Sequence, residues 1–215
     1  MPHDQKTPVR TGRPPLTERR KAETRLEVAR AAVRLFLANG VAGTSAEDIA
    51  AAAGISSRTL WRYFPTKDSC VKPLLTGGIE HTARCLRSWR RDQGVTDLLD
   101  MMREQAAGTV NDIATDRTAL LNLVRLTRTE PGLRAVWLEA HREAEPVFAE
   151  ALAQRAGLPG PDLAVTVQAA MINTALRVAV EHESFTTDPA EAETAGYPEA
   201  AVYEALLIAA RGFPS

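Results

Sequence analysis

Apolar residues recur at helical spacing near the start of the chain. Over residues 26–37 they follow the intervals i, i+3, i+7, i+10 and i+11, which predicts a helix beginning at Thr17 with one apolar face. Asn39-Gly40 follows the run, and a glycine there is typical of a helix end because it readily adopts the left-handed conformation. The apolar positions are Leu26, Ala29, Val33, Phe36 and Leu37.

A second, short helix is predicted over the segment TSAEDIA. Ser45 is a residue type that caps helix N-termini, and Asp48 stands three positions later, where a capping box places an acid. Gly54 then allows a tight turn before the next helix.

A third helix begins after Ser56, another good N-cap. It ends at Phe64-Pro65, because a residue before proline avoids the α conformation. Three short helices, the last two joined by a glycine turn, describe a helix-turn-helix. The alternative is an ordinary three-helix bundle with no ligand.

The exposed face of the third helix favours a ligand. Leu60 and Phe64 point inward at i, i+4, which leaves two arginines and a tryptophan outside. Like charges at i, i+4 destabilise a helix, and an exposed tryptophan is unusual unless it contacts something. An anionic partner explains both features. The outward residues are Ser57, Arg58, Trp61 and Arg62.

The charge distribution agrees with this interpretation. The net charge is −1, but residues 1–73 hold 13 Lys and Arg against 7 Asp and Glu, a net of +6. The remaining residues hold 13 against 20, a net of −7. A basic head on an acidic body indicates that one end meets a polyanion, although a chance fluctuation gives the same count.

The stretch from Leu26 to Lys72 resembles the DNA-binding domain of the TetR family of bacterial transcriptional regulators. The matching text includes TSAEDIAAAAGIS and TLWRYFPTKDS. The resemblance implies an all-α protein with a flexible N-terminal arm over 1–16 and a helix-turn-helix DNA-binding domain over 17–70. It also implies a larger helical domain over 71–215 that binds an effector and forms a homodimer.

The resemblance also implies a set of DNA contacts. The third helix would enter the major groove of double-stranded DNA, led by its N-terminal residues. Arg58 departs from the family, which often has a small residue there, so it is a candidate to read guanine, or else it contacts phosphate alone. Lys67, after an N-capping Thr66, would open the fourth helix and bind phosphate. The candidate DNA-binding residues are Ser45, Ser57, Arg58, Thr59, Trp61, Arg62, Tyr63 and Lys67.

The remainder of the chain reads as helices over 67–91, 96–112, 116–129, 132–156, 162–183 and 198–211. Pro73 and Gly77-Gly78 interrupt the first of these, which predicts a hinge, a plain kink or two shorter helices. The helix over 132–156 keeps its apolar face across Pro146. The loop over 186–198 is expected to be exposed.

The helix over 162–183 is apolar on two sides, so it must be buried on two sides. One side can face its own domain and the other a symmetry mate. Together with 198–211 it would form a four-helix homodimer interface, as the family resemblance also implies. A two-fold dimer predicts a pseudo-palindromic operator.

An effector pocket is expected among the middle helices. Asn173 and Arg177 lie i, i+4 on an otherwise apolar helix, where unpaired polar groups are unfavourable. They can orient a ligand, pair within the dimer interface, or meet an acid such as Glu139 or Glu143. The remaining candidates are more typical of a core. The full set is Trp89, Met102, Trp137, His141, Phe148, Asn173 and Arg177.

The sequence gives little support for an enzyme, a metal-binding protein or a membrane protein. The four histidines are scattered and no H-E-x-x-H, G-x-S-x-G or phosphate loop occurs, so we expect no enzyme, metal site or cofactor. Cys70 and Cys85 do not form a C-x-x-C pair. No run of eighteen apolar residues occurs and the N-terminus lacks an apolar leader, so a cytoplasmic protein with no membrane segment is expected.

The sequence therefore predicts a ligand-responsive transcriptional regulator, released from DNA by a small-molecule effector and acting as a repressor. An activator or architectural DNA-binding protein with a degenerate pocket is the alternative.

Overall fold

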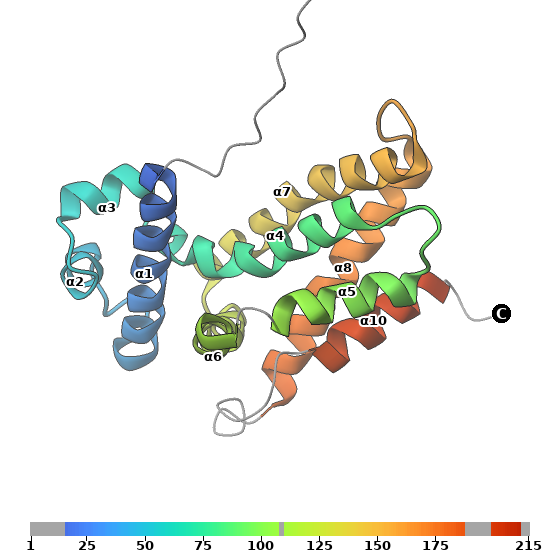
Figure 1. Cartoon of the computed structure of the whole chain (residues 1–215). Coiled ribbons are helices and arrows are strands. Elements are labelled where there is room, and N and C mark those ends of the chain that lie inside the picture. The colour runs from blue at the N-terminus through green and yellow to red at the C-terminus, as the bar shows by residue number, and fades with distance from the viewer. Residues whose placement is uncertain (1–15, 108–109, 188–198, 212–215) are drawn as a thin grey trace, which may run out of the picture.

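The computed structural model describes residues 16–107, 110–187 and 199–211, and every regular element in these ranges is a helix. This confirms the all-α prediction. Three helices lie together at one end of the molecule and form the head, and the helices that follow them form the body (Figure 1). The head consists of α1 (Leu16–Asn39), α2 (Ala46–Ala52) and α3 (Ser57–Tyr63).

The ends of the head helices follow the sequence signals. The Ser45 hydroxyl accepts from the Asp48 amide while the Asp48 carboxylate accepts from the Ser45 amide, which confirms the capping box. Ser56 caps α3 through the amide of Thr59, and Phe64 leaves the helix in an extended conformation. The glycine that follows α1 and the one between α2 and α3 adopt positive φ angles, +74° at Gly40 and +67° at Gly54.

The start of the body differs from the prediction. A short 3₁₀ turn, η1 (Asp68–Val71), precedes α4 (Lys72–Ser88), so the predicted helix over 67–91 is two elements. Pro73 lies in the first turn of α4, where its missing amide proton leaves no helical bond unmade. It therefore begins the helix, and the prediction that it interrupts one was wrong.

The other body helices follow the predicted order with shifted bounds. Residues 110–112 belong to α6 and not to the helix predicted over 96–112. Pro146 lies inside a continuous helix, as predicted. The elements are α5 (Val95–Ala107), α6 (Val110–Leu126), α7 (Pro131–Ala156), α8 (Leu163–Thr186) and α10 (Glu199–Arg211).

Helix α8 packs against α6, α7 and α10. It is long and apolar enough to cross a membrane by length and composition alone, which the sequence analysis did not anticipate. A third of its most apolar stretch is buried within the chain, and core helices meet the same criterion. Of the predicted segments, residues 1–15 of the arm and 188–198 of the loop lie outside the described ranges.

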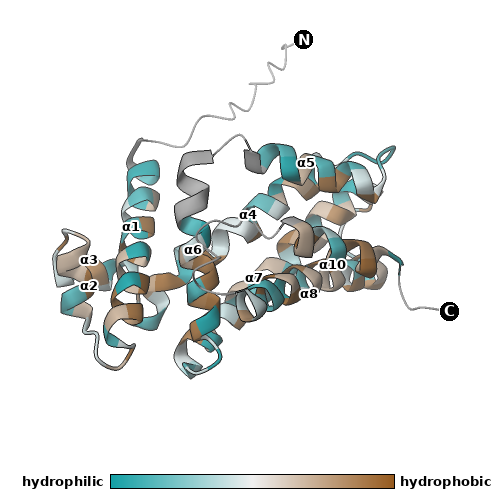
Figure 2. Cartoon of the chain, turned by 90° about the horizontal axis from the view of Figure 1, so that it is seen from below, coloured by the Kyte–Doolittle hydropathy of each residue, from teal (hydrophilic) through white to brown (hydrophobic). Residues whose placement is uncertain are grey.

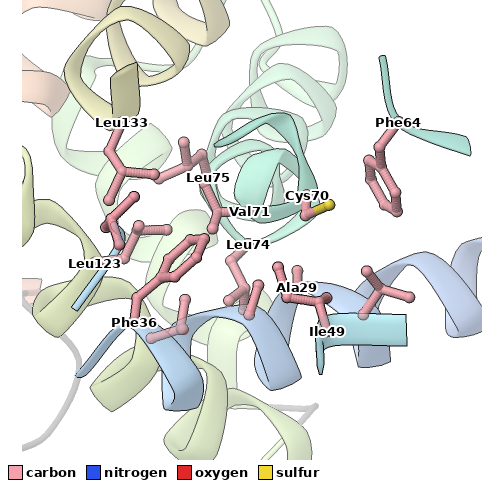
Figure 3. Packing of buried hydrophobic residues seen from close by; sticks show 14 of the residues in the cluster. Ala29, Phe36, Ile49, Phe64, Cys70, Val71, Leu74, Leu75, Leu123 and Leu133 are labelled. Carbon is pink, nitrogen blue, oxygen red and sulfur yellow. The ribbon is translucent and has the colours of Figure 1, made fainter. Parts of the chain in front are cut away.

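Two hydrophobic cores hold these helices together. The first runs from the head into the body: Phe36 of α1 and Val71 of η1 are packed in one cluster with Leu123 of α6 and Leu133 of α7 (Figure 3). The second lies deeper in the body, among α4, α5, α7, α8 and α10. On the predicted face of α1, Ala29, Val33 and Phe36 are buried, Leu26 is half-buried, and Leu37 is 48% exposed.

Lys67 occupies a different place from the one predicted. It precedes η1, and its ammonium donates to the carbonyl oxygens of Val41 and Thr44, at 2.5 and 2.9 Å. These carbonyls belong to the loop between α1 and α2. The side chain therefore ties η1 to the head and satisfies two backbone acceptors.

We expect Lys67→Met to destabilise the free protein by about 1–3 kcal/mol, because two part-buried carbonyl groups lose a charged donor. Chemical unfolding of the free protein measures this. Lys21→Met, which removes an exposed lysine bonded to Glu18, is the matched control. Equal stabilities of the two variants would show that the Lys67 bonds contribute nothing.

Candidate nucleic-acid interface and ligand cleft

Helix α3 presents the face that its spacing predicts. Leu60 is fully buried and Phe64 is 5% exposed, so both anchor the helix to the head. Arg58 and Arg62 are exposed, Trp61 is 46% exposed, and Ser57 is half-buried. Within the described ranges, neither arginine forms an ion pair with an acid. Two guanidinium groups and an indole therefore stand on one open face.

Two hydroxyls among the predicted DNA contacts are already engaged. The Ser45 hydroxyl donates to the Asp48 carboxylate at 2.6 Å, and these bonds to the carboxylate lower the pKa of Asp48. The Thr59 hydroxyl lies 2.9 Å from that of Ser56, the N-cap of α3. Both residues stabilise helix ends in the free protein, and a bond to phosphate has to share or replace these contacts.

Tyr63 links α3 to α1. The guanidinium of Arg25 lies 5.2 Å from the Tyr63 ring centre, and that of Arg62 lies 5.1 Å from it. Both distances fit cation–π attraction. From the sequence, Arg25 at the front of the first helix is either a weaker candidate for a phosphate contact or a solvated charge. Helical spacing gives no sign of its contact with Tyr63, because the two residues lie on separate helices.

A cleft of about 1440 Å³ lies between the head and the body. Residues of α1, of the end of α3 and of the segment after it line the cleft on the head side, and residues of α4, α5, α6 and α7 line the rest. An ion pair spans two of these helices, from Lys72 of α4 to Glu143 of α7 at 2.6 Å. None of the seven residues predicted for the effector pocket lines this cleft.

The structure places those seven residues in internal contacts. Phe148 and Met102 are buried in the second core. The Trp89 indole donates to the carbonyl of Gly94 and packs beneath the Arg155 guanidinium, 3.7 Å from the ring centre. That they contact an effector stays a prediction.

The remaining four form a polar network between α7 and α8. Trp137 donates to Glu181, which also pairs with Arg177 at 2.8 Å, so the acid that meets Arg177 is neither Glu139 nor Glu143. Nδ1 of His141 lies 2.7 Å from the Asn173 side-chain oxygen, and the Asn173 amide donates to the His141 carbonyl.

His141 is 5% exposed, and burial lowers its pKa more than the Asn173 bond raises it. Its Nε2 atom is buried with no hydrogen-bond partner among the described residues. A neutral ring, with Nδ1 carrying the proton, fits this environment, because a second buried N–H would lack an acceptor.

The described residues contain no group of three or more His, Cys, Asp or Glu side chains placed to hold a metal ion. Burial raises the pKa of the Cys70 thiol to about 12 and raises that of Cys85. These thiols are therefore poor nucleophiles.

Two family descriptions match the chain. Residues 29–74 match "Bacterial regulatory proteins, tetR family", and residues 96–195 match "MftR C-terminal domain". The chain is 28% identical over 148 residues to the HTH-type transcriptional regulator TcmR of Streptomyces glaucescens. That alignment covers 67% of this chain and 66% of TcmR, so the chain spans just under two thirds of that relative's length.

Solved structures share the fold. The fatty acid degradation regulator FadR of Bacillus halodurans superposes with a TM-score of 0.52 at 18% identity, covering 86% of this chain and 94% of that one. FadR of Thermus thermophilus is described as a TetR-family transcriptional repressor in complex with lauroyl-CoA. It superposes with a TM-score of 0.50 at 23% identity, covering 89% of this chain and 95% of that one. At these identities the likeness concerns the fold alone.

We expect acid to destabilise this protein through His141. The folded pKa is lower than the ordinary value of 6.5, so below pH 6.5 the unfolded chain binds more protons and stability falls as pH falls, by up to about 1.4 kcal/mol per pH unit. Unfolding free energies from pH 7.5 to 5 should therefore decline less steeply in His141→Gln than in the wild type. His182→Gln, at an exposed histidine, is the control. Parallel curves for His141→Gln and wild type would contradict the expectation.

Proposed function

The chain belongs to the TetR family of bacterial regulatory proteins, and from this premise we propose that it is a ligand-responsive transcriptional repressor. It binds double-stranded DNA as a homodimer, and a small molecule releases it. The observation that carries this proposal is the exposed face of α3, with Arg58, Trp61 and Arg62 directed away from the core. We assign it no enzymatic activity and place it in the cytoplasm, where the DNA is.

We assign the DNA-binding domain to residues 17–70 and the effector-binding and dimerisation domain to 71–215, with 1–16 as an arm. Helix α3 enters the major groove, and Ser57 and Arg58 at its N-terminal end face the base edges. Arg58 donates two parallel hydrogen bonds to guanine O6 and N7. Trp61 and Arg62 lie further along the helix and contact the sugar-phosphate backbone of the DNA.

Tyr63 and Lys67 have structural roles beside their proposed phosphate contacts. The Tyr63 ring stacks with Arg25 and Arg62. The contact with Tyr63 would hold the Arg62 guanidinium close to the sugar-phosphate backbone of the DNA. Lys67 uses two of its three donors on backbone carbonyls, so one N–H remains for phosphate. The loss of Lys67 would therefore lower both stability and affinity.

The homodimer interface is proposed on α8 and α10. These helices pack side by side, and hydrophobic positions follow both (Figures 1 and 2). The buried row of α8 faces its own chain, including Val165 and Ala169. The second predicted row is open: Val167 is 48% exposed and Val178 47%, and Ile208 on α10 is 59% exposed. Exposed aliphatic side chains in one row suit a second copy of the same surface.

The repressor proposal is tested by selecting bound sequences from random double-stranded DNA. We expect a pseudo-palindrome with half-sites about one helical turn, roughly 34 Å, apart. Arg58→Ala should relax the preference at one position in each half-site, with about 1–3 kcal/mol less discrimination against the wrong base. Arg62→Ala is the comparison, and it should lower the affinity for all DNA sequences by the same factor. The absence of any preferred site at moderate salt would defeat the proposal.

We expect the double variant Val167→Glu, Val178→Glu to be a folded monomer that has lost specific DNA binding, because four like charges would meet across the two-fold interface. Sedimentation velocity reports the oligomeric state and circular dichroism the helix content. Gln168→Glu changes an exposed residue of the same helix outside the row and should remain dimeric. An unchanged dimer in the double variant would place the interface elsewhere.

A further inference from the structure

We propose that the cleft between head and body is the effector site, that its ligand is an amphipathic organic anion, and that Gly77 provides the space for the ligand's apolar part. The regulatory consequence rests on the proposed function, whereas ligand binding itself does not. Four observations support the proposal, concerning space, apolar surface, charge and the position of the walls.

The first observation is the space beside Gly77. This residue lies inside α4 and lines the cleft, and a Cβ atom built on it would meet no atom within 4 Å. The glycines with positive φ in the described ranges are Gly40, Gly54 and Gly157, so the backbone at position 77 does not require glycine. Glycine is among the poorest helix formers. Gly77 is itself exposed, so the space it leaves belongs to the open part of the cleft.

The second observation is the apolar surface within the same cleft. Leu26 of α1, Leu120 of α6 and Val136 of α7 all line the cleft and are half-buried. Three helices thus contribute aliphatic side chains to one cavity. Ligand pockets are concave and largely apolar, with few polar groups that fix orientation.

The third observation is the charge that remains once the ion pairs are formed. Asp116, Glu139 and Glu143 line the cleft, but each is bonded to a cation: Arg30, Arg142 and Lys72 respectively. Among the described residues that line the cleft, Glu80 is then the acid that forms no ion pair. Arg25 and Arg84 also line the cleft without one in the described part of the chain. Two cations against one acid favour an anionic ligand.

Arg84 is the better placed of these two arginines, since Arg25 is already stacked on Tyr63. The residue after Arg84, Cys85, donates its thiol proton to the Gln105 side-chain oxygen at 3.5 Å. That bond leaves the Gln105 NH₂ group to donate toward a ligand. Guanidinium and amide donors at the α4–α5 end of the cleft suit the oxygens of a carboxylate or sulfonate.

The fourth observation is the position of the walls. Leu26 and Phe64 of the head and Val136 of the body line the same cleft, so a ligand between them contacts both parts of the chain. A ligand that fits one head orientation better than another shifts the population toward it. Release of DNA would follow if that orientation does not match two successive major grooves.

Binding is tested with a matched pair of probes, 8-anilinonaphthalene-1-sulfonate and N-phenyl-1-naphthylamine, which share the aromatic rings but differ in the sulfonate. Fluorescence titration of the full chain without DNA gives both affinities. We expect Gly77→Leu to weaken both probes at least tenfold, because the leucine fills the cleft. Arg84→Gln should weaken the sulfonate about tenfold and change the neutral probe by less than about twofold.

Two control variants separate this proposal from its alternatives. Gly77→Ala strengthens the helix while filling little space, so it should change affinity by less than about threefold, whereas a hinge at Gly77-Gly78 predicts an effect as large as that of leucine. Leu138→Ser, at an exposed apolar residue of α7 that does not line the cleft, tests binding of the probes to apolar surface elsewhere and should leave both affinities unchanged. Thermal unfolding shows whether Gly77→Leu is folded, and Arg84→Gln tests the cleft without adding bulk.

The proposal is overturned if neither Gly77→Leu nor Arg84→Gln weakens binding of the sulfonate probe, or if Leu138→Ser does so instead. It is also overturned if alanine at position 77 acts as strongly as leucine. The DNA arm is separate: the sulfonate probe should lower affinity for a selected operator in the wild type and not in Gly77→Leu. If the protein selects no operator, the proposed function fails while the fluorescence titrations still decide the ligand site.

Discussion

The packing of the head against the body through one buried hydrophobic cluster is the constraint on which the rest of the structure depends. Phe36 of α1 and Val71 of η1 lie in the same core as Leu123 of α6 and Leu133 of α7. Because close-packed interiors do not deform smoothly, the head cannot turn without repacking these residues. The direction of α3, and with it the face that carries Arg58, is therefore set by helices whose residues are fifty or more positions away in the chain.

The junction also has an open side. The cleft adjoins the buried cluster and is lined by charged and apolar residues of the same helices, with Lys72 and Glu143 paired across α4 and α7. A buried contact on one side and an accessible cavity on the other make the junction the place where a bound molecule can alter head orientation most directly. The polar network of His141, Asn173 and Glu145 lies away from the cleft and joins α7 to α8. It fixes how these helices meet, because each buried polar group depends on its partner.

Features set by neighbouring residues could be predicted from the sequence, whereas contacts between distant residues could not. Ser45 with Asp48, Ser56, Gly54 and Phe64-Pro65 act through hydrogen bonds and dihedral preferences within a few residues, so the ends of the head helices could be predicted. Lys67 could not be placed in this way. Its partners, Val41 and Thr44, lie more than twenty residues earlier, and the family pattern names the lysine without showing the bonds it makes. Pro73 was misread because a proline that begins a helix and one that breaks it look alike when η1 is not foreseen.

By itself the sequence determined the helical class, the order of the helices, the inward and outward faces of α3 and the two apolar rows of α8, because each depends on periodicity or on neighbouring residues. Only the tertiary structure decided which polar residues meet. Residue type selected Trp137, His141, Asn173 and Arg177 as candidates for a pocket, and folding paired them with one another and with Glu181. The cleft is formed instead by residues of α1, α3 and the segment after it, α4, α5, α6 and α7, and residue type does not single these residues out. A cavity is a property of how helices are arranged in space, and helix–helix arrangement is set by packing between residues far apart in the chain.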